Sequence, residues 1–407
     1  MKTNRQIYIE QFQYALIAFP VGILVGCIDA LFGRILLWIG DFRNSHLLYL
    51  LPFLALAGLF ILFLYWKFSK ESLKGMTLIF QTGHGEAEHI PLLLVPLVIV
   101  STWITHLFGG SAGREGVAVQ LGGAIAHTLG KKLNRLNQPR MFLVIGMAAG
   151  FGGLFQTPIA ATFFAMEVLI SGVILYETLF PSLIAAFTAS YTAHLCGLEK
   201  FSISIPLFQP SSNLQILKIL LCCVLFGIVG GLFAYLLKNA KSFLAKKINS
   251  PYLRIAIVGL ILSILFLLLH FGRYSGLGTN LISMGFGKQT IYSYDWILKM
   301  LLTILTLSAG YQGGEVTPLF AIGTALGVTL ASLLGLPVML IAACGYIAVF
   351  GGATNTLFAP IIIGIELFGG ANAFWFILAC CIAYVFNGCQ SIYGNQKRHR
   401  IFHHSNS

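Results

Sequence analysis

Charged residues are scarce in this chain of 407 residues: Asp, Glu, Lys and Arg together make up 9% of it, whereas apolar residues make up 57%. A soluble chain of this length would fold into two or three domains, whose surfaces would need many more charges. The composition therefore excludes an ordinary soluble protein. It predicts a polytopic membrane protein, in contact with the lipid bilayer along most of its length.

Acidic residues are fewer than basic ones, 13 against 25, and the formal net charge is +12. Such an excess can attract nucleic acid, but no groove-reading motif accompanies it, so we expect no nucleic-acid partner. The basic residues gather instead in short connections between apolar segments, as the positive-inside rule requires of cytoplasmic loops. We predict a multi-pass protein of the inner (plasma) membrane with both termini cytoplasmic. The basic residues concerned are Lys2, Arg5, Lys67, Lys70, Lys74, Lys131, Lys132, Arg135, Arg140, Lys238, Lys241, Lys246, Lys247, Arg254, Lys397, Arg398 and Arg400.

Signatures of metal sites, disulfide frameworks and intramembrane enzymes are missing. The cysteines have no CxxC spacing, and we interpret them as small buried hydrophobic side chains. A histidine-rich stretch at 399–404 has no acidic or cysteine companion. HExxH, a GxGD-like acid pair and GxSxG beside a histidine are also lacking. We therefore expect no enzyme, no metal and no cofactor. The eight cysteines are Cys27, Cys196, Cys222, Cys223, Cys344, Cys380, Cys381 and Cys389.

Clean apolar runs of the roughly 20 residues that a simple membrane-spanning helix needs are few. Glycine and proline interrupt most of them, as at Gly150–Gly153, Pro158, Gly351–Gly352 and Pro360. Broken and re-entrant helices are tolerated only where protein or a water-filled cavity surrounds the freed backbone groups. The interruptions predict an all-α protein whose helices break around an internal pathway.

One pattern occurs twice, at an offset of about 200 residues, which indicates an internal repeat. We predict a first half at 1–197 that opens with an amphipathic segment at 1–13, a linker at 198–213, a second half at 214–395 and a tail at 396–407, without a regulatory domain. Two such halves usually meet at a midplane site built from the ends of discontinuous helices. The matched features are Gly113 with Gly313, Glu115 with Glu315, Phe151–Gly153 with Phe350–Gly352, Pro158 near the counterpart of Pro360, and Glu167 with Glu366.

Each half places a carboxylate in glycine-broken backbone, Glu115 in GlyArgGluGlyVal and Glu315 in GlyGlyGluValThrPro. An acid at membrane depth is costly and therefore indicates a function. Glycine lets amide N–H groups converge on an anion, and the helices that follow add their positive N-terminal ends. The carboxylate of Glu115 can compete with the anion for this cradle and leave it when protonated, which would couple protons to the anion. The alternative is a buried ion pair between Arg114 and Glu115 that fixes helix packing.

These residues resemble the CLC family of chloride channels and anion/proton antiporters. The family pattern GREGP is matched by Gly113, Arg114, Glu115 and Gly116, with Val117 in place of proline. Most relatives have GGIFAP where this chain has GlyGlyGluValThrPro, and both carry a C-terminal tyrosine, here Tyr393. The resemblance covers nearly all of the chain and implies an inverted repeat of two halves and a homodimer with one pathway per subunit. It also implies that Glu115 is the external gate, and that the amides of Glu315 and Val316, with the Tyr393 hydroxyl, line the central anion site.

The departures from the chloride pattern resemble the fluoride-exporting branch. They are Met76 in place of the serine of GSGIP, Val117 after GREG, and Glu315 followed two residues later by Thr317. A rival register for Met76 is GlnThrGlyHisGly at 81–85. In that branch the inner proton-transfer glutamate is missing, and Val168 falls near its position here. Glu315 is then a candidate relay, and the Thr317 hydroxyl or a protonated carboxyl could partly replace the water around fluoride. Core filling by Met76 and helix capping by Thr317 are the competing interpretations.

We therefore predict proton-coupled export of fluoride, with H+ and a small inorganic anion as the partners. A chloride/proton antiporter or a passive chloride channel of the same fold is the alternative. A cation-coupled carrier fits less well, because the carboxylates lie among amides suited to anions. Among other titratable residues, we expect Glu167 and Glu366 to cap helices or to form pairs at an interface. We expect His106 and His127 to be histidines with satisfied hydrogen bonds, not proton carriers. Asp29 has no identified partner. The predicted anion-site residues are Met76, Gly113, Arg114, Gly116, Val117, Glu315, Val316, Thr317 and Tyr393.

Overall fold

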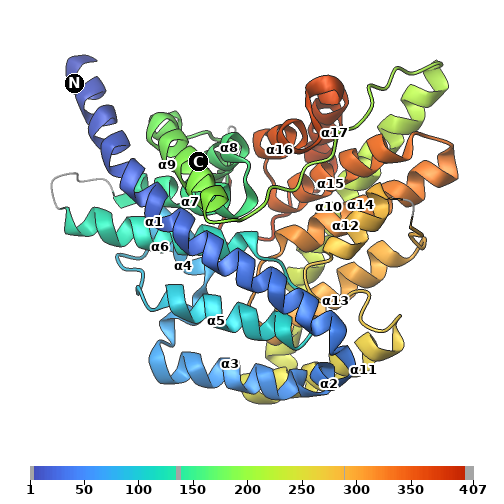
Figure 1. Cartoon of the computed structure of the whole chain (residues 1–407), viewed down its shortest axis with the longest axis horizontal. Coiled ribbons are helices and arrows are strands. Elements are labelled where there is room, and N and C mark those ends of the chain that lie inside the picture. Colours follow the sequence, from blue (N-terminus) through green and yellow to red (C-terminus); the bar gives the residue numbers. More distant parts are fainter. Residues whose placement is uncertain (1–3, 134–138, 288, 399–407) are drawn as a thin grey trace, which may run out of the picture.

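The computed structural model describes residues 4–133, 139–287 and 289–398. Lys2, Arg135, Arg400 and the histidine-rich stretch at 399–404 lie outside these ranges. Within the described ranges almost every element is a helix, and the one sheet is a short parallel pair of β1 (Ile170–Ser171) and β2 (Lys397–Arg398). The predicted all-α membrane fold is confirmed by this architecture (Figure 1).

The helices of the two halves follow one another in the same order. In Figure 1 the first half, blue to green, lies mainly to one side of the second half, yellow to red. The first half contains α1 (Asn4–Ser45), α2 (Leu47–Leu50), α3 (Leu54–Phe68), α4 (Met76–Gly83), α5 (Leu94–Leu107), α6 (Glu115–Lys132), α7 (Pro139–Phe155), α8 (Pro158–Glu167) and α9 (Leu179–Leu195). The second contains α10 (Asn213–Lys247), α11 (Pro251–Leu268), α12 (Thr279–Phe286), α13 (Asp295–Ala309), α14 (Val316–Leu334), α15 (Val338–Thr354), α16 (Phe358–Phe368) and α17 (Ala373–Phe386). Short 3-10 turns are η1 (Leu51–Phe53), η2 (Glu71–Lys74), η3 (Tyr176–Thr178) and η4 (Gly370–Asn372).

Many helices are too short to cross a membrane. Among the described residues, the stretches long and apolar enough to do so are Tyr8–Ser45, Leu47–Phe68, Asn213–Lys247, Pro251–Leu268 and Val316–Leu334. The breaks between the shorter helices follow the sequence. Pro158 begins α8 directly after α7 ends, and Asn355, with a φ of 55°, ends α15 before α16. A non-glycine residue with positive φ stops a helix because it cannot continue the right-handed path.

The same close helix crossing occurs once in each half. In the first half, a Cβ at Gly122 of α6 would collide with the carbonyl oxygen of Gly146 of α7. In the second half, a Cβ at Gly323 of α14 would collide with the carbonyl oxygen of Gly345 of α15. Small residues of this kind let membrane helices approach backbone to backbone. The equivalent crossings show that the two halves share a packing plan as well as an order of helices.

A reciprocal pair of caps joins the two halves. The carboxylate of Glu167, at the end of α8, accepts hydrogen bonds from the backbone N–H groups that begin α16, at 3.1 Å from Leu357 and 2.8 Å from Ala359. The carboxylate of Glu366 accepts from the N–H groups of Ile159 and Ala160 in α8, at 3.3 and 2.9 Å. This repeat-related pair therefore caps helices across the interface between the halves, as expected.

Three sequence interpretations need correction. The interruptions predicted at Gly150–Gly153 and Gly351–Gly352 are wrong, because both stretches lie inside continuous helices, α7 and α15, where the missing side chains allow close helix packing. Several basic residues assigned to loops lie in helices: Lys241 is inside α10, and Lys131 is in the last turn of α6. A membrane helix can extend past the apolar core, so basic side chains can follow it without a loop. Four cysteines are buried as predicted, but Cys27, Cys196, Cys381 and Cys389 are exposed, and none of the eight is in a disulfide.

Candidate functional site

The two glycine-rich motifs meet through their backbones. The N–H of Gly113 donates to the carbonyl of Gly314 at 2.5 Å, and the N–H of Gly314 donates back to the carbonyl of Gly113 at 2.8 Å. Close approach requires the missing side chain here, since a Cβ at Gly313 would lie 2.5 Å from the Cβ of Ala112. This antiparallel bridge brings the first residues of α6 and α14 together in the interior of the protein.

The carboxylate of Glu115 reaches across to the N-terminus of α14. Its Oε2 accepts the hydroxyl of Thr317 at 2.5 Å and the backbone N–H of the same residue at 3.1 Å. The N–H of Arg114 lies 3.3 Å from the same oxygen. The Glu115 side chain is 1% exposed, so these donors replace water for it. Donors that hold a carboxylate at a positive helix end would also suit a small anion.

Thr317 therefore bonds to the carboxylate of Glu115 and does not cap its own helix. The N-cap of α14 is Glu315, which makes no side-chain capping bond. The hydroxyl of Thr317 instead points back to the carboxylate of Glu115, 202 residues earlier in the chain. The interpretation of Thr317 as a helix cap is wrong.

Arg114 forms the ion pair that was the alternative explanation for this motif, but only loosely. Its Nε lies 3.6 Å from Oε1 of Glu115, beyond hydrogen-bond distance. Among the described residues, Nε and Nη1 of Arg114 and Oε1 of Glu115 have no hydrogen-bond partner. The guanidinium of Arg114 thus supplies positive charge without a direct hydrogen bond to the carboxylate, which is held by Thr317 and by the backbone N–H of Arg114.

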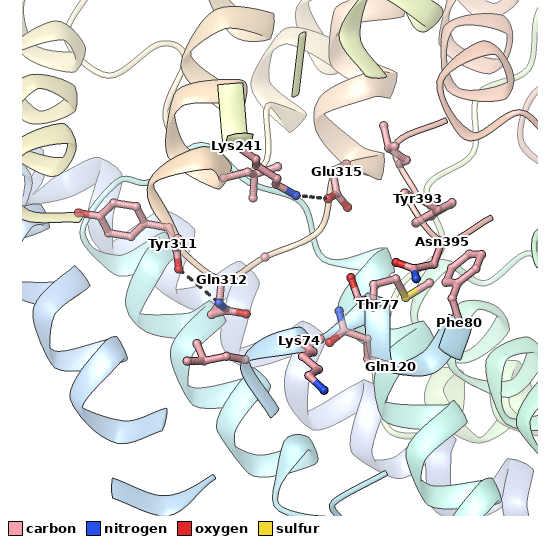
Figure 2. A pocket seen from close by; sticks show the side chains of 18 residues that line it. Lys74, Thr77, Phe80, Gln120, Lys241, Tyr311, Gln312, Glu315, Tyr393 and Asn395 are labelled. Atoms are coloured by element: carbon pink, nitrogen blue, oxygen red, sulfur yellow. Dashed lines mark hydrogen bonds and ion pairs between the residues drawn. The ribbon is translucent and has the colours of Figure 1, made fainter. Parts of the chain in front are cut away.

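Glu315, the repeat counterpart of Glu115, faces a cavity of about 340 Å³. Its side chain is 15% exposed, and its Oε1 lies 3.8 Å from Nζ of Lys241. Figure 2 shows this pair, from α10 and the start of α14, on one wall of the cavity. A Cβ added at Gly116 would lie 3.7 Å from Oε2 of Glu315, so the second carboxylate borders the first motif as well as the cavity.

Met76 and Tyr393 line the same cavity as Glu315. Met76 begins α4 after Gly75, whose φ of 50° favours glycine, and it both borders the cavity and packs against the core. The ring of Tyr393 stacks on Phe80 with the ring centroids 5.0 Å apart. Its hydroxyl is buried and has no hydrogen-bond partner among the described residues. An unpartnered buried hydroxyl in a cavity wall is available to a ligand.

The predicted site residues thus fall into two groups. Met76, Glu315 and Tyr393 line the cavity, whereas the others lie where α6 and α14 begin. Val117 and Val316 are fully buried, and neither borders the cavity. The second group is Gly113, Arg114, Gly116, Val117, Val316 and Thr317.

Several polar cavity residues were not predicted as site residues from the sequence, and Lys241 and Gln120 lie among them. Lys241 was counted among the cytoplasmic lysines, and nothing in the sequence places it beside Glu315. Gln120 lies on α6 just after the motif and its Oε1 has no partner among the described residues. A lone amide in a run of small and apolar residues, five positions after Glu115, was a usable signal for Gln120.

Two other buried titratable residues lie apart from this cavity. Asp29 is fully buried, and neither of its carboxyl oxygens has a hydrogen-bond partner in the described part of the chain, as expected. His106 was expected to be satisfied, but its Nε2 has no partner within the described ranges. The expectation for His106 is therefore wrong for one of its ring nitrogens.

Comparison with known proteins supports this reading of the motifs. A family model described as voltage gated chloride channel matches residues 57–388. A chloride/fluoride channel protein of Pseudomonas syringae pv. tomato is 36% identical over 394 residues, which cover 93% of this chain and 86% of that protein. A crystal structure of a CLC-type fluoride/proton antiporter is 51% identical, with a TM-score of 0.95, and the match covers 98% of this chain and 100% of that one.

A slow cyanobacterial Cl−/H+ antiporter has the same fold. Its crystal structure is 19% identical with a TM-score of 0.81, and the match covers 93% of this chain and 96% of that one. The resemblance seen in the sequence is confirmed by these matches: the chain belongs to the voltage-gated chloride channel (CLC) family.

Proposed function

We propose that this member of the CLC family is a fluoride/proton antiporter that exports fluoride, and that Glu115 both closes the anion route and carries the proton. The carboxylate of Glu115 is the observation that carries the proposal, because the Thr317 hydroxyl and amide hold it at the N-terminus of α14. The fluoride-transporting relative of 51% identity supports the choice of ion.

The geometry suits a gate that opens on protonation. An ionised Glu115 accepts the donors of Thr317 and carries the same charge as the anion, so the two compete for one place. Protonation removes the charge and weakens these charge-assisted bonds. The carboxyl can then leave the N-terminus of α14, and an anion from the cavity can take its donors. Return of the carboxylate after loss of its proton completes the exchange.

Hydroxyl donors near the route favour fluoride over chloride. Fluoride is the smaller ion and the stronger hydrogen-bond acceptor, so it needs strong donors in place of its water. The Tyr393 hydroxyl is unpartnered in the described chain, and the Thr317 hydroxyl becomes free once Glu115 leaves. Met76 occupies the cavity wall without offering a donor.

We further propose that Glu315 passes the proton between Glu115 and the cavity. It lies between the first motif and Lys241, and it is the acid among the cavity-lining residues. Lys74 also lines the cavity, and it is the last of the basic residues Lys67, Lys70 and Lys74. We therefore place the cavity on the cytoplasmic side. In this arrangement both termini are cytoplasmic, in the cell membrane. As in the family, we expect a homodimer with one pathway per subunit.

Fluxes from liposomes test the function. Vesicles containing purified protein and loaded with NaF are diluted into fluoride-free buffer, and a fluoride electrode and a pH electrode record both ions. We expect fluoride efflux to drive protons inward against their gradient. Replacing NaF with NaCl should give much slower efflux. Chloride efflux equal to or faster than fluoride efflux would reject fluoride export in favour of a chloride/proton antiporter or a chloride channel.

The variant E115Q tests the gate in the same assay. We expect fluoride to flow without proton movement, because glutamine cannot carry the proton. The matched control is E86Q, which removes an exposed carboxylate that pairs with Lys397 at 2.7 Å outside the site. Proton movement that persists in E115Q at the level of E86Q would contradict the gating role of Glu115.

A further inference from the structure

A second cavity has a volume of about 410 Å³, and its position relative to the first follows from two candidate membrane spans. Leu47 lines the second cavity and Leu73 lines the first, and the apolar span Leu47–Phe68 runs between them. The span Pro251–Leu268 likewise separates Lys241, in the first cavity, from Phe271, in the second. Two membrane spans, one from each half, thus place the cavities on opposite faces.

The second cavity is the repeat counterpart of the first. The first cavity is formed at the start of α4, after Gly75, and beside Lys241 in the last part of α10. The second is formed at the start of α12, after Gly278, and beside Arg43 in the last part of α1. Both glycines have positive φ, 50° and 89°. When α2 and α3 are counted as the one stretch Leu47–Phe68, α4 matches α12 and α1 matches α10 in the order of helices. An inverted repeat therefore places one such cavity on each face.

Arg43 and His106 are buried in the wall of the second cavity, and each has a side-chain nitrogen without a hydrogen-bond partner among the described residues. Arg43 is 7% exposed and His106 is 1% exposed. The guanidinium donates to the carbonyl of His106 at 3.3 Å and to Oδ1 of Asn44 at 2.8 Å. Its Nε, and Nε2 of His106, have no partner among the described residues. The Nε of a guanidinium always carries a proton, and such a buried donor without a partner is costly unless a ligand satisfies it.

The charges around this cavity leave an excess of positive charge. Arg273 is neutralised by Asp295, 2.6 Å away, and Asp41 lies exposed at the rim, where water screens it. Lys299 is fully buried behind the loop that leads into α12, and its ammonium donates to the carbonyls of Tyr274 and Gly276 at 3.0 and 2.7 Å. Arg43 and Lys299 form no ion pair with any acid of the described residues. The positive N-terminus of α12 adds to the same field.

We propose that this cavity is an outward-facing anion site, in which Arg43 and the N-terminus of α12 bind a small monovalent inorganic anion between the gate and the external solution. His106 adjoins the backbone of Gly113, two residues before Glu115, so the site lies directly behind the gate motif. The identification of this anion as fluoride, and the direction of its movement, rest on the proposed function. The cavity chemistry itself requires only an anion.

Flux measured separately from each face tests the site. Inside-out and right-side-out membrane vesicles that contain the full-length protein are assayed over a range of NaF concentrations. We expect R43Q to raise the half-saturating fluoride concentration at the external face by about tenfold, because a charged donor to the anion is lost. The value at the cytoplasmic face should not change. The mirror variant K241Q should raise the value at the cytoplasmic face alone.

Further variants, and the same measurements made with chloride, distinguish failure of the proposed site from failure of the proposed function. R43K should restore most of the external affinity, and R43M replaces R43Q as the uncharged variant should R43Q fail to fold, as judged by size exclusion. An external value in the uncharged variant equal to that of the unmodified protein would overturn the site, as would equal changes at both faces. If the unmodified protein carries chloride and not fluoride, the proposed function falls, and the same comparison made with NaCl still decides whether the external site exists.

Discussion

Glu115 and Glu315 occupy equivalent places in the two halves, yet their surroundings differ. Glu115 is fully buried and bonded across the repeat to Thr317, whereas Glu315 borders a cavity and approaches Lys241. The two motifs differ two residues after the acid: the side chain of Val117 in the first half cannot donate a hydrogen bond, and that of Thr317 in the second half can. The Thr317 hydroxyl of the second half therefore bonds to Glu115 of the first half, whereas the side chain of Val117 offers no such bond to Glu315. A repeat supplies two similar backbones, and a single hydroxyl decides which carboxylate is held.

The largest expected difference between the halves is the effect of neutralising each acid. In E115Q we expect fast, uncoupled fluoride flow. In E315Q we expect proton movement and fluoride turnover to fall together, by roughly tenfold or more, because Glu115 still closes the route but loses its proton relay. Fluoride and pH electrodes on the same vesicles measure both. Uncoupled flow in E315Q, as fast as in E115Q, would show that the two acids do the same work.

Removing the hydroxyl of Thr317 should weaken the closure of the anion route by Glu115 without abolishing it. T317V deletes the hydroxyl that lies 2.5 Å from the Glu115 carboxylate but keeps the size of the side chain. A hydrogen bond to a charged group contributes about 1.5–3 kcal/mol, so we expect an uncoupled fluoride leak at least about tenfold above that of the unmodified protein. T324V is the matched control on the same helix, because the buried hydroxyl of Thr324 has no partner in the described chain. Equal leaks in the two variants would remove Thr317 from the gate.

The smallest expected difference concerns the reciprocal caps, which lie away from the gate. Glu167 accepts three backbone N–H groups and Glu366 accepts two. Loss of a cap costs about 0.5–2 kcal/mol, so we expect E167A to lower the thermal unfolding midpoint in detergent more than E366A does. Coupled fluoride transport should persist in both. A loss of proton coupling in E167A alone would give Glu167 a part in the proton route.

Much of the fold could be predicted from local sequence. The break before Pro158 and the two acids in glycine-rich backbone follow from what the residues themselves tolerate within a membrane. The break expected at the Phe350–Gly352 motif does not occur, because the motif lies inside α15. The groups that donate hydrogen bonds to the Glu115 carboxylate could be predicted in part, since Thr317 was proposed as an ion contact. The position of Lys241 could not, because a lysine near a cytoplasmic helix end has the same sequence signature whether it meets water or Glu315.

The sequence by itself determined the class of protein, the repeat and the pair of acids, because the cost of charge and of unpaired backbone in lipid constrains each segment locally. Only the tertiary structure decided that Glu115 bonds to Thr317, 202 residues away, and that Arg43 and His106 meet in a second cavity. Contacts between distant segments depend on how two inverted halves cross. The crossing is set by close packing at glycines such as Gly113 and Gly314, whose partners no local pattern specifies.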